Sequence, residues 1–203
     1  MNSSISHSGF PQRLGRRSPV PTIVLAAVMA ALVFVVTKVV FVPISVVPGQ
    51  IFNAGDIVIF IAAWTFGPAI GGLAGGVGSS LSDALTGGVY APFTLIIKGS
   101  EGALAGYFAL KGFRRAQVTS WFLAGLAMVG GYFITNAFFI GLIFGADSPF
   151  NPGLALAIVE VPFDIAQVLA GGIIGGPISR YLKSALPSGF FPARPTQAGP
   201  VRK

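Results

Sequence analysis

The sequence predicts an all-α, polytopic membrane protein: a six-transmembrane-helix bundle with both termini in the cytoplasm. Of its 203 residues, 53% are apolar and only 9% are charged, whereas a soluble domain has about a quarter charged residues. Six long apolar segments follow one another, each ended by Pro, Gly or basic residues, which stop helices. The net charge of +7 comes from basic residues that border these segments. Such residues set membrane topology, so nucleic acid is not an expected partner.

The chain divides into a tail, a membrane domain and a second tail. Residues 1–21 are polar and basic, and we expect a cytoplasmic N-terminal tail. Residues 22–183 form the transmembrane domain. Residues 184–203 are rich in Pro, Gly and Arg, a composition typical of a disordered tail.

The first span is expected at residues 23–42, a run longer than the apolar part of a signal peptide and without a cleavage site after it. The other five are expected at residues 54–66, 69–86, 93–110, 120–144 and 153–181. Glycine pairs at four-residue spacing, such as Gly71/Gly75 and Gly102/Gly106, favour close helix packing. The alternative is a phosphate-binding loop, but packing is favoured because no Gly-rich segment leads into a Gly-Lys-Ser/Thr ending.

The distribution of Lys and Arg fixes the orientation. With the N-terminus inside, eleven of the thirteen basic residues fall on the cytoplasmic side: Arg13, Arg16, Arg17, Lys111, Arg114, Arg115, Arg180, Lys183, Arg194, Arg202 and Lys203. Lys38 and Lys98 lie within spans, and the outer loops contain no Lys or Arg. A count of five or seven helices would place a basic terminus outside, against the positive-inside rule.

The chain lacks the residues that several kinds of catalytic and metal-binding site require. The chain has no Cys, which excludes disulfides, thiolate nucleophiles and Cys-ligated metals. Its one histidine, His7, lies in the polar tail, so a Ser–His pair or a His-ligated metal within the membrane is also excluded. We therefore expect no cofactor, no metal and no enzymatic activity.

Ionisable residues inside the spans are the strongest functional signal, because charge in hydrocarbon is costly. The sequence places seven there: Lys38, Asp56, Asp83, Lys98, Glu101, Glu160 and Asp164. Counted from the outer helix ends, their depths run from about 3 Å to about 16 Å at 1.5 Å per residue. All seven fall in the outer half of the membrane. This pattern predicts a polar cup that opens outward and is closed beneath by apolar packing.

Some of these residues also have structural interpretations. Lys38 is expected to extend to the outer interface, and Asp56 to cap the second span at that interface. Asp83 can close a turn with the backbone of residues 86–88. Lys98 and Glu101, three residues apart, can form a structural ion pair.

The candidate ligand site combines these charges with amides and aromatic rings of the same layer. Glu160 and Asp164 share a helix face, which Gln167 extends, and two like charges there favour a cation or donor between them. Tyr132, Asn136 and Phe139 form a second stripe. The expected substrate-binding residues are Asn53, Tyr90, Lys98, Glu101, Tyr132, Asn136, Glu160, Asp164 and Gln167. An apolar pocket with a few convergent polar groups suits a small, partly aromatic molecule.

Several segments resemble the substrate-binding S components of energy-coupling factor (ECF) vitamin transporters, in the riboflavin-type and related branch. They are Gly55-Asp56, Phe66-Gly67-Pro68, the glycines of residues 71–78, Ser82-Asp83-Ala84-Leu85, and residues 91–99. The resemblance implies six helices in a prokaryotic plasma membrane and capture of a vitamin or precursor from outside. It also implies two kinds of partner, a transmembrane coupling subunit and two cytoplasmic ATPase subunits.

The family contacts its coupling subunit through an Ala-x-x-x-Ala motif on the first helix. This sequence offers two registers, Ala26/Ala30 and Ala27/Ala31, and such small-residue strips let a second helix approach closely. The alternative is a self-sufficient secondary transporter, although such proteins usually show paired inverted repeats. A membrane enzyme acting on lipids is disfavoured because its acids usually lie at the cytoplasmic face.

Overall fold

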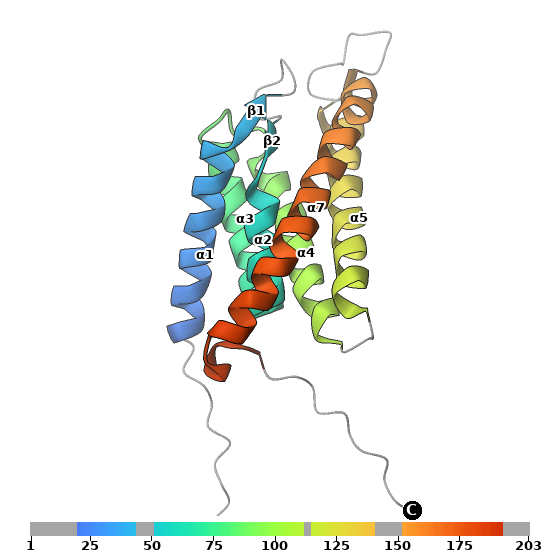
Figure 1. Cartoon of the computed structure of the whole chain (residues 1–203). Coiled ribbons are helices and arrows are strands. Elements are labelled where there is room, and N and C mark those ends of the chain that lie inside the picture. Colours follow the sequence, from blue (N-terminus) through green and yellow to red (C-terminus); the bar gives the residue numbers. More distant parts are fainter. Residues whose placement is uncertain (1–19, 44–50, 112–114, 141–151, 193–203) are drawn as a thin grey trace, which may run out of the picture.

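The computed structural model describes residues 20–43, 51–111, 115–140 and 152–192. Its helices are α1 (Val20–Val39), α2 (Gly55–Phe66), α3 (Pro68–Ala84), α4 (Ala91–Leu110), α5 (Ala116–Ile134), the π-helix η1 (Thr135–Ile140), α7 (Pro152–Ala185) and the 3-10 helix η2 (Ser188–Phe190). The two strands are β1 (Phe41–Pro43) and β2 (Ile51–Asn53). Six long helices run along one common direction, and the sequence-based expectation of a six-helix bundle is confirmed (Figure 1).

Three of these helical segments are long and apolar enough to cross a membrane: α1, α5 continued by η1, and α7. The bundle exposes large apolar side chains along its sides, among them Val28, Phe122, Leu126 and Ile173. Helix α2 is apolar but has only 12 residues, about 18 Å of helix. In Figure 1 the helix begins below the end of the bundle that carries the strands, and β2 leads the chain down to its first residue.

Glycines determine how closely α3 approaches α4. The chain turns between α2 and α3 at Gly67, whose φ of 92° favours glycine, and Pro68 opens the next helix. A Cβ on Gly71 would lie 2.8 Å from the carbonyl oxygen of Gly102, and one on Gly75 would lie 2.5 Å from that of Lys98. The two backbones are thus in direct contact, as expected from the glycine spacing. This contact fixes the backbone of Lys98 in the interior of the bundle.

Two features depart from the expected elements. Between the first two expected spans, at residues 23–42 and 54–66, β1 and β2 pair antiparallel, with Val42 opposite Phe52; residues 44–50 lie outside the described residues. The expected single span at residues 120–144 is divided into α5 and the π-helix η1, and residues 141–144 are not described. Helix α7 continues to Ala185, beyond the expected end at residue 181, and η2 follows it.

Candidate functional site

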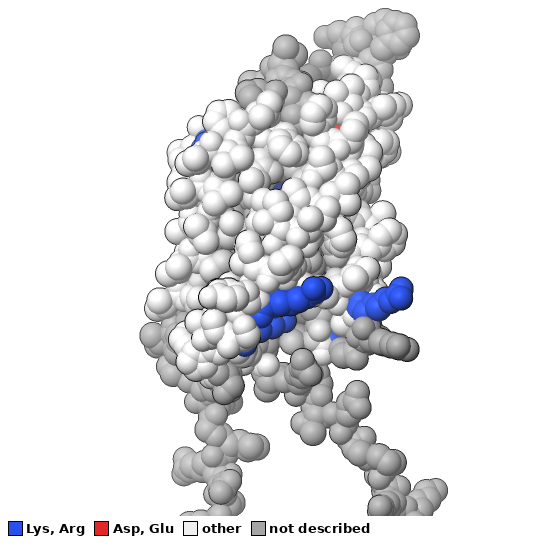
Figure 2. Space-filling view, viewed as in Figure 1, with Lys and Arg blue, Asp and Glu red and all other residues white. Residues whose placement is uncertain are grey.

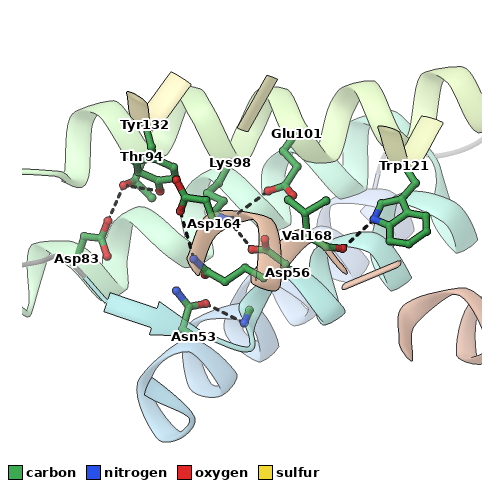
Figure 3. Close-up of polar contacts among 12 residues, drawn as sticks. Asn53, Asp56, Asp83, Thr94, Lys98, Glu101, Trp121, Tyr132, Asp164 and Val168 are labelled. Atoms are coloured by element: carbon green, nitrogen blue, oxygen red, sulfur yellow. Dashed lines mark hydrogen bonds and ion pairs between the residues drawn. The ribbon is translucent and has the colours of Figure 1, made fainter. Parts of the chain in front are cut away.

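A cluster of polar side chains is buried inside the bundle, toward the end that carries the β1–β2 hairpin (Figures 1 and 3). We call it the polar cluster; each member is at most 9% exposed. It consists of Asn53, Asp56, Asp83, Tyr90, Thr94, Lys98, Glu101, Tyr132, Asn136, Glu160, Asp164 and Gln167. These residues come from β2, α2, α3, α4, α5, η1 and α7 and the turn before α4. Nearly every element of the bundle therefore contributes to the cluster.

Lys98 is the only basic residue of the polar cluster. Its ammonium forms an ion pair with Asp56 of α2 and lies 3.3 Å from the Oε2 of Glu101, one turn farther along α4 (Figure 3). The ammonium also lies 5.7 Å from the ring centroid of Tyr132, within range of a cation–π contact. The cluster thus has five carboxyl groups and a single ammonium, which makes it rich in hydrogen-bond acceptors.

A second group of contacts joins α3, α4 and α5. The hydroxyl of Thr94 donates to the Oδ2 of Asp83 at 2.5 Å and lies 3.0 Å from the hydroxyl oxygen of Tyr132. Because the single proton of Thr94 is directed at Asp83, Tyr132 is the donor in the second bond. Tyr132 is thereby held with its ring facing the ammonium of Lys98.

A third group joins the start of α4 to η1 and α7. Tyr90 donates its hydroxyl proton to the Oδ1 of Asn136 at 2.7 Å, and the amide nitrogen of Asn136 donates to Glu160. Asn136 lies in the π-helix, a type of segment that is frequent at functional sites because it reorients side chains. The same change of helical register leaves Phe139, expected on the stripe of Tyr132 and Asn136, 49% exposed.

The remaining members have hydrogen-bonding capacity to spare. Gln167 donates to the Oδ1 of Asp164 at 3.4 Å, and the Oδ1 of Asn53 accepts the backbone N–H of Gly55 at 2.8 Å. Within the described parts of the chain, four cluster side chains hold buried oxygens without a hydrogen-bond partner: Asp56, Glu101, Asp164 and Gln167. Unpaired buried acceptors are costly, and a bound molecule with several donors would satisfy them.

A narrow cavity lies between these side chains. It is lined by Asn53, Asp83, Tyr90, Lys98, Tyr132, Glu160, Asp164 and Gln167, and its volume is about 20 Å³. That volume holds about one water molecule. A larger molecule can enter only if side chains or helices of the cluster move apart.

The structure brings together all nine residues that the sequence analysis placed in a substrate site. Seven of them line the cavity, while Glu101 and Asn136 contact lining residues from behind. Asp83 also lines it, and Asp56 and Thr94 contact its walls; these three are not among the residues expected to bind the substrate.

The structure also shows whether Asp56, Asp83 and Lys38 have the structural roles expected of them. The expectation that Asp56 caps α2 at the interface is wrong: the cap position is Ala54, and Asp56 is 1% exposed and paired with Lys98. The turn after α3 is closed by the backbone carbonyl of Asp83, at 2.8 Å from the N–H of Thr86, which leaves the carboxylate for Thr94. Lys38 is half-buried and donates to the hydroxyl of Thr86.

The opposite end of the bundle is basic. Lys111, Arg115, Arg180 and Lys183 lie at the ends of α4, α5 and α7 there, and Figure 2 shows basic side chains gathered over this end. Every Asp and Glu of the described residues belongs to the polar cluster at the other end. Polar contacts near the basic end are uncharged or cationic, such as the bond of 3.0 Å from the Trp64 indole to Ser120.

Of the two alanine registers on α1, one faces inward and one outward. Ala26 is buried against α2 and α3, and Ala30 is half-buried. Ala27 and Ala31 are exposed on the outer side of the bundle.

Comparisons with known proteins agree with this geometry. The family described as "ECF-type riboflavin transporter, S component" matches residues 18–184. The thiamine precursor transporter HmpT of Lactococcus lactis is 32% identical over 82% of this chain and 90% of its own length. An uncharacterised protein of Pyrococcus woesei is 38% identical over 76% of this chain and 96% of its length.

A solved structure shows the same fold. The S component of a bacterial ECF transporter superposes with a TM-score of 0.64, covering 83% of this chain and 98% of that one, at 20% sequence identity. At that identity the likeness concerns the fold alone.

Proposed function

Because the chain belongs to the ECF-type riboflavin transporter S-component family, and is thus a multi-pass protein of the prokaryotic plasma membrane, we propose that it is the subunit that captures a vitamin or vitamin precursor. The polar cluster is the binding site. The observation that carries the proposal is a set of buried acceptor oxygens without partners among the described residues: those of Asp164 and Gln167 in the cavity wall, and those of Asp56 and Glu101 beside Lys98.

The orientation follows from the two chemically different ends of the bundle. Basic residues flanking transmembrane helices remain on the cytoplasmic side. The basic end therefore faces the cytoplasm, and the polar cluster and the β1–β2 hairpin face outward. The ligand enters from the hairpin end, and both termini lie inside.

The cluster selects the chemistry of the ligand. Carboxylates and amide oxygens accept hydrogen bonds, so the preferred ligand carries several N–H or O–H donors or a positive charge. Tyr90 and Tyr132 supply aromatic walls, which favour a flat ring. A thiamine precursor, as the name of the Lactococcus relative indicates, or another donor-rich aromatic vitamin meets both requirements.

Binding requires the cluster to open. The cavity of about 20 Å³ is far smaller than a pocket of about 300 Å³ or more, the usual size for such ligands. The contact between Asn136 and Glu160 links η1 to α7, whereas the contact between Gln167 and Asp164 lies within α7. A ligand whose donors replace the Asn136–Glu160 contact would separate η1 from α7, while the ion pair of Lys98 with Asp56, between α4 and α2, stays intact.

The chain itself supplies no step of ATP hydrolysis, and transport would depend on the coupling subunit and two ATPases. The exposed Ala27/Ala31 strip on α1 is the proposed contact with the coupling subunit, since small side chains allow close helix approach. Ala26 packs in the core of the bundle and Ala30 is half-buried, so this register holds α1 against its neighbouring helices.

Uptake in a host without its own ECF system tests this assignment. Cells that express the chain together with a coupling subunit and ATPases should accumulate a labelled vitamin or precursor, whereas cells that express the chain alone should bind it without accumulating it. ATP depletion should abolish accumulation and leave binding intact. ATP-independent accumulation by the chain alone would identify a self-sufficient secondary transporter instead.

A further inference from the structure

A groove runs between α5 and α7 on the side of the bundle, away from the polar cluster. Its volume is about 440 Å³ and its walls are entirely apolar, with Val118, Trp121, Phe122 and Leu126 on α5 facing Ile165 and Leu169 on α7. From Val118 to Val129 it extends about 17 Å along α5 at 1.5 Å per residue. This length is close to one leaflet of a hydrocarbon core about 30 Å thick.

The groove arises because α5 and α7 are held apart by one large side chain. The indole of Trp121 packs against Gly172, where a Cβ would collide with it, and its N–H donates to the carbonyl oxygen of Val168 at 2.7 Å. This wedge leaves Phe122 69% exposed and Leu126 60% exposed on the wall beside it.

Positive charge lies at one end of the groove. Arg180 of α7 donates from Nε to the side-chain oxygen of Gln117 at 3.1 Å, which bridges the two helices next to Val118. Arg115 is the N-cap residue of α5, three residues before Val118. Since the described acids all lie in the polar cluster, neither guanidinium has an acidic neighbour at this end.

We propose that this groove holds an acyl chain of an anionic phospholipid, whose phosphate lies against Arg180 and Arg115. The guanidinium group of an arginine can donate two parallel hydrogen bonds to the oxygens of a phosphate. Basic pockets between transmembrane helices also bind anionic head groups. The N-terminal end of α5, which carries the positive end of the helix dipole, lies next to Arg115 and also favours an anion there.

Charge and shape favour a lipid over a protein partner. The groove is concave and about as long as one leaflet is thick, and its basic end would lie among the head groups, because basic residues flank membrane spans at the cytoplasmic interface. A transmembrane helix of a partner protein would pack more closely on a flat strip of small residues, such as Ala27/Ala31 of α1, than in this groove. The lipid would fill the space beside Trp121 and hold α5 against α7.

Native mass spectrometry of the full-length protein can test the proposal. Delipidated protein in detergent is titrated with an equimolar mixture of phosphatidylglycerol and phosphatidylcholine that carry the same acyl chains. The wild type should retain one phosphatidylglycerol about fivefold or more in preference to phosphatidylcholine, and Arg180→Gln should reduce this preference about fivefold. Val118→Trp, an exposed position at the mouth of the groove, should reduce retention of both lipids.

Lys111→Gln is the matched control, because it removes the same charge at the same end while Lys111 lies 4.6 Å from the ring centroid of Tyr107 on α4. It should leave the lipid preference unchanged. Equal retention of both lipids by the wild type, or equal losses in Lys111→Gln and Arg180→Gln, would overturn the proposal. Unchanged lipid retention in Val118→Trp, with loss of assembly with the coupling subunit, would show that the groove is a protein interface.

Discussion

Lys98 and Asp56 form an ion pair between α4 and α2 in the interior of the bundle, where their side chains are only 3% and 1% exposed. Glu101 lies one turn from Lys98 and shares its ammonium. The pair joins the helix that packs on the glycines of α3 to the short helix that begins beneath the hairpin. It therefore supports the wall of the proposed binding site as well as the fold.

Removal of the ammonium should destabilise the protein strongly. Lys98→Met leaves Asp56 and Glu101 as buried carboxylates without a counter-charge, a change that costs about 3–5 kcal/mol. Thermal unfolding of the purified protein in detergent, without ligand, should show a large decrease in the unfolding temperature. The triple variant Lys98→Met, Asp56→Asn, Glu101→Gln should recover most of that loss, because no charge remains buried. An unfolding temperature of Lys98→Met equal to that of the wild type would show that the ion pair is not buried as described.

Close packing of α3 on α4 gives a second prediction. Gly71→Ala places a methyl group 2.6 Å from the Cβ of Ala63 and 2.8 Å from the Gly102 oxygen, and should lower the unfolding free energy by about 1–3 kcal/mol. Gly130→Ala is the matched control, because nothing lies within 4 Å of its Cβ. The control should unfold at the wild-type temperature or slightly above it. Similar behaviour of the two variants would contradict the direct backbone contact of α3 and α4.

Substitutions in the two alanine pairs of α1 should have different effects, one on transport and the other on stability. Ala27→Leu changes an exposed position, so it should preserve unfolding temperature and ligand binding but reduce uptake with the ECF partners at least tenfold. Ala26→Leu crowds a buried position and should lower stability by about 1–3 kcal/mol. Ala155→Leu, exposed on α7, serves as a control for added bulk and should affect neither property. Normal uptake by Ala27→Leu would exclude this strip as the docking surface.

Orientation can be measured directly because the chain has no cysteine of its own. Leu85→Cys, exposed between α3 and α4 at the hairpin end, should react with a membrane-impermeant maleimide added to intact cells. Ser184→Cys, exposed at the basic end, should react only after the cells are lysed. The reverse labelling pattern would place the polar cluster on the cytoplasmic side.

The sequence predicted the helices well because hydropathy, helix-stopping residues and the placement of Lys and Arg are local signals. The acidic and amide residues expected in one layer do lie close together, because the position of a residue along a helix follows from residue count. The position of the start of α2 within the bundle was not predicted. Asp56 was assigned to an interfacial cap because it follows an apparent loop, but β2 carries the chain into the bundle first, so the same residue is buried beside Lys98.

Other features depend on contacts that sequence spacing does not encode. The strands β1 and β2 have three residues each, too few to give an alternating pattern. The π-helix η1 changes the register after Ile134, so Phe139 leaves the face of Tyr132 that regular helical spacing assigns to it. Thr94 gave no signal because its hydroxyl becomes functional only beside Asp83 of another helix.

The central claim is that the polar cluster binds the transported molecule, and ligand retention by its variants tests this most directly. Glu160→Gln combined with Asp164→Asn removes two carboxylates from the cavity wall, whereas Ser179→Ala removes a buried hydroxyl about 22 Å farther along α7. Mass spectrometry of small molecules that co-purify with each protein should find a donor-rich aromatic compound with the wild type and Ser179→Ala, and at least tenfold less with the double variant. Equal amounts of the same compound with all three proteins would show that the ligand binds elsewhere.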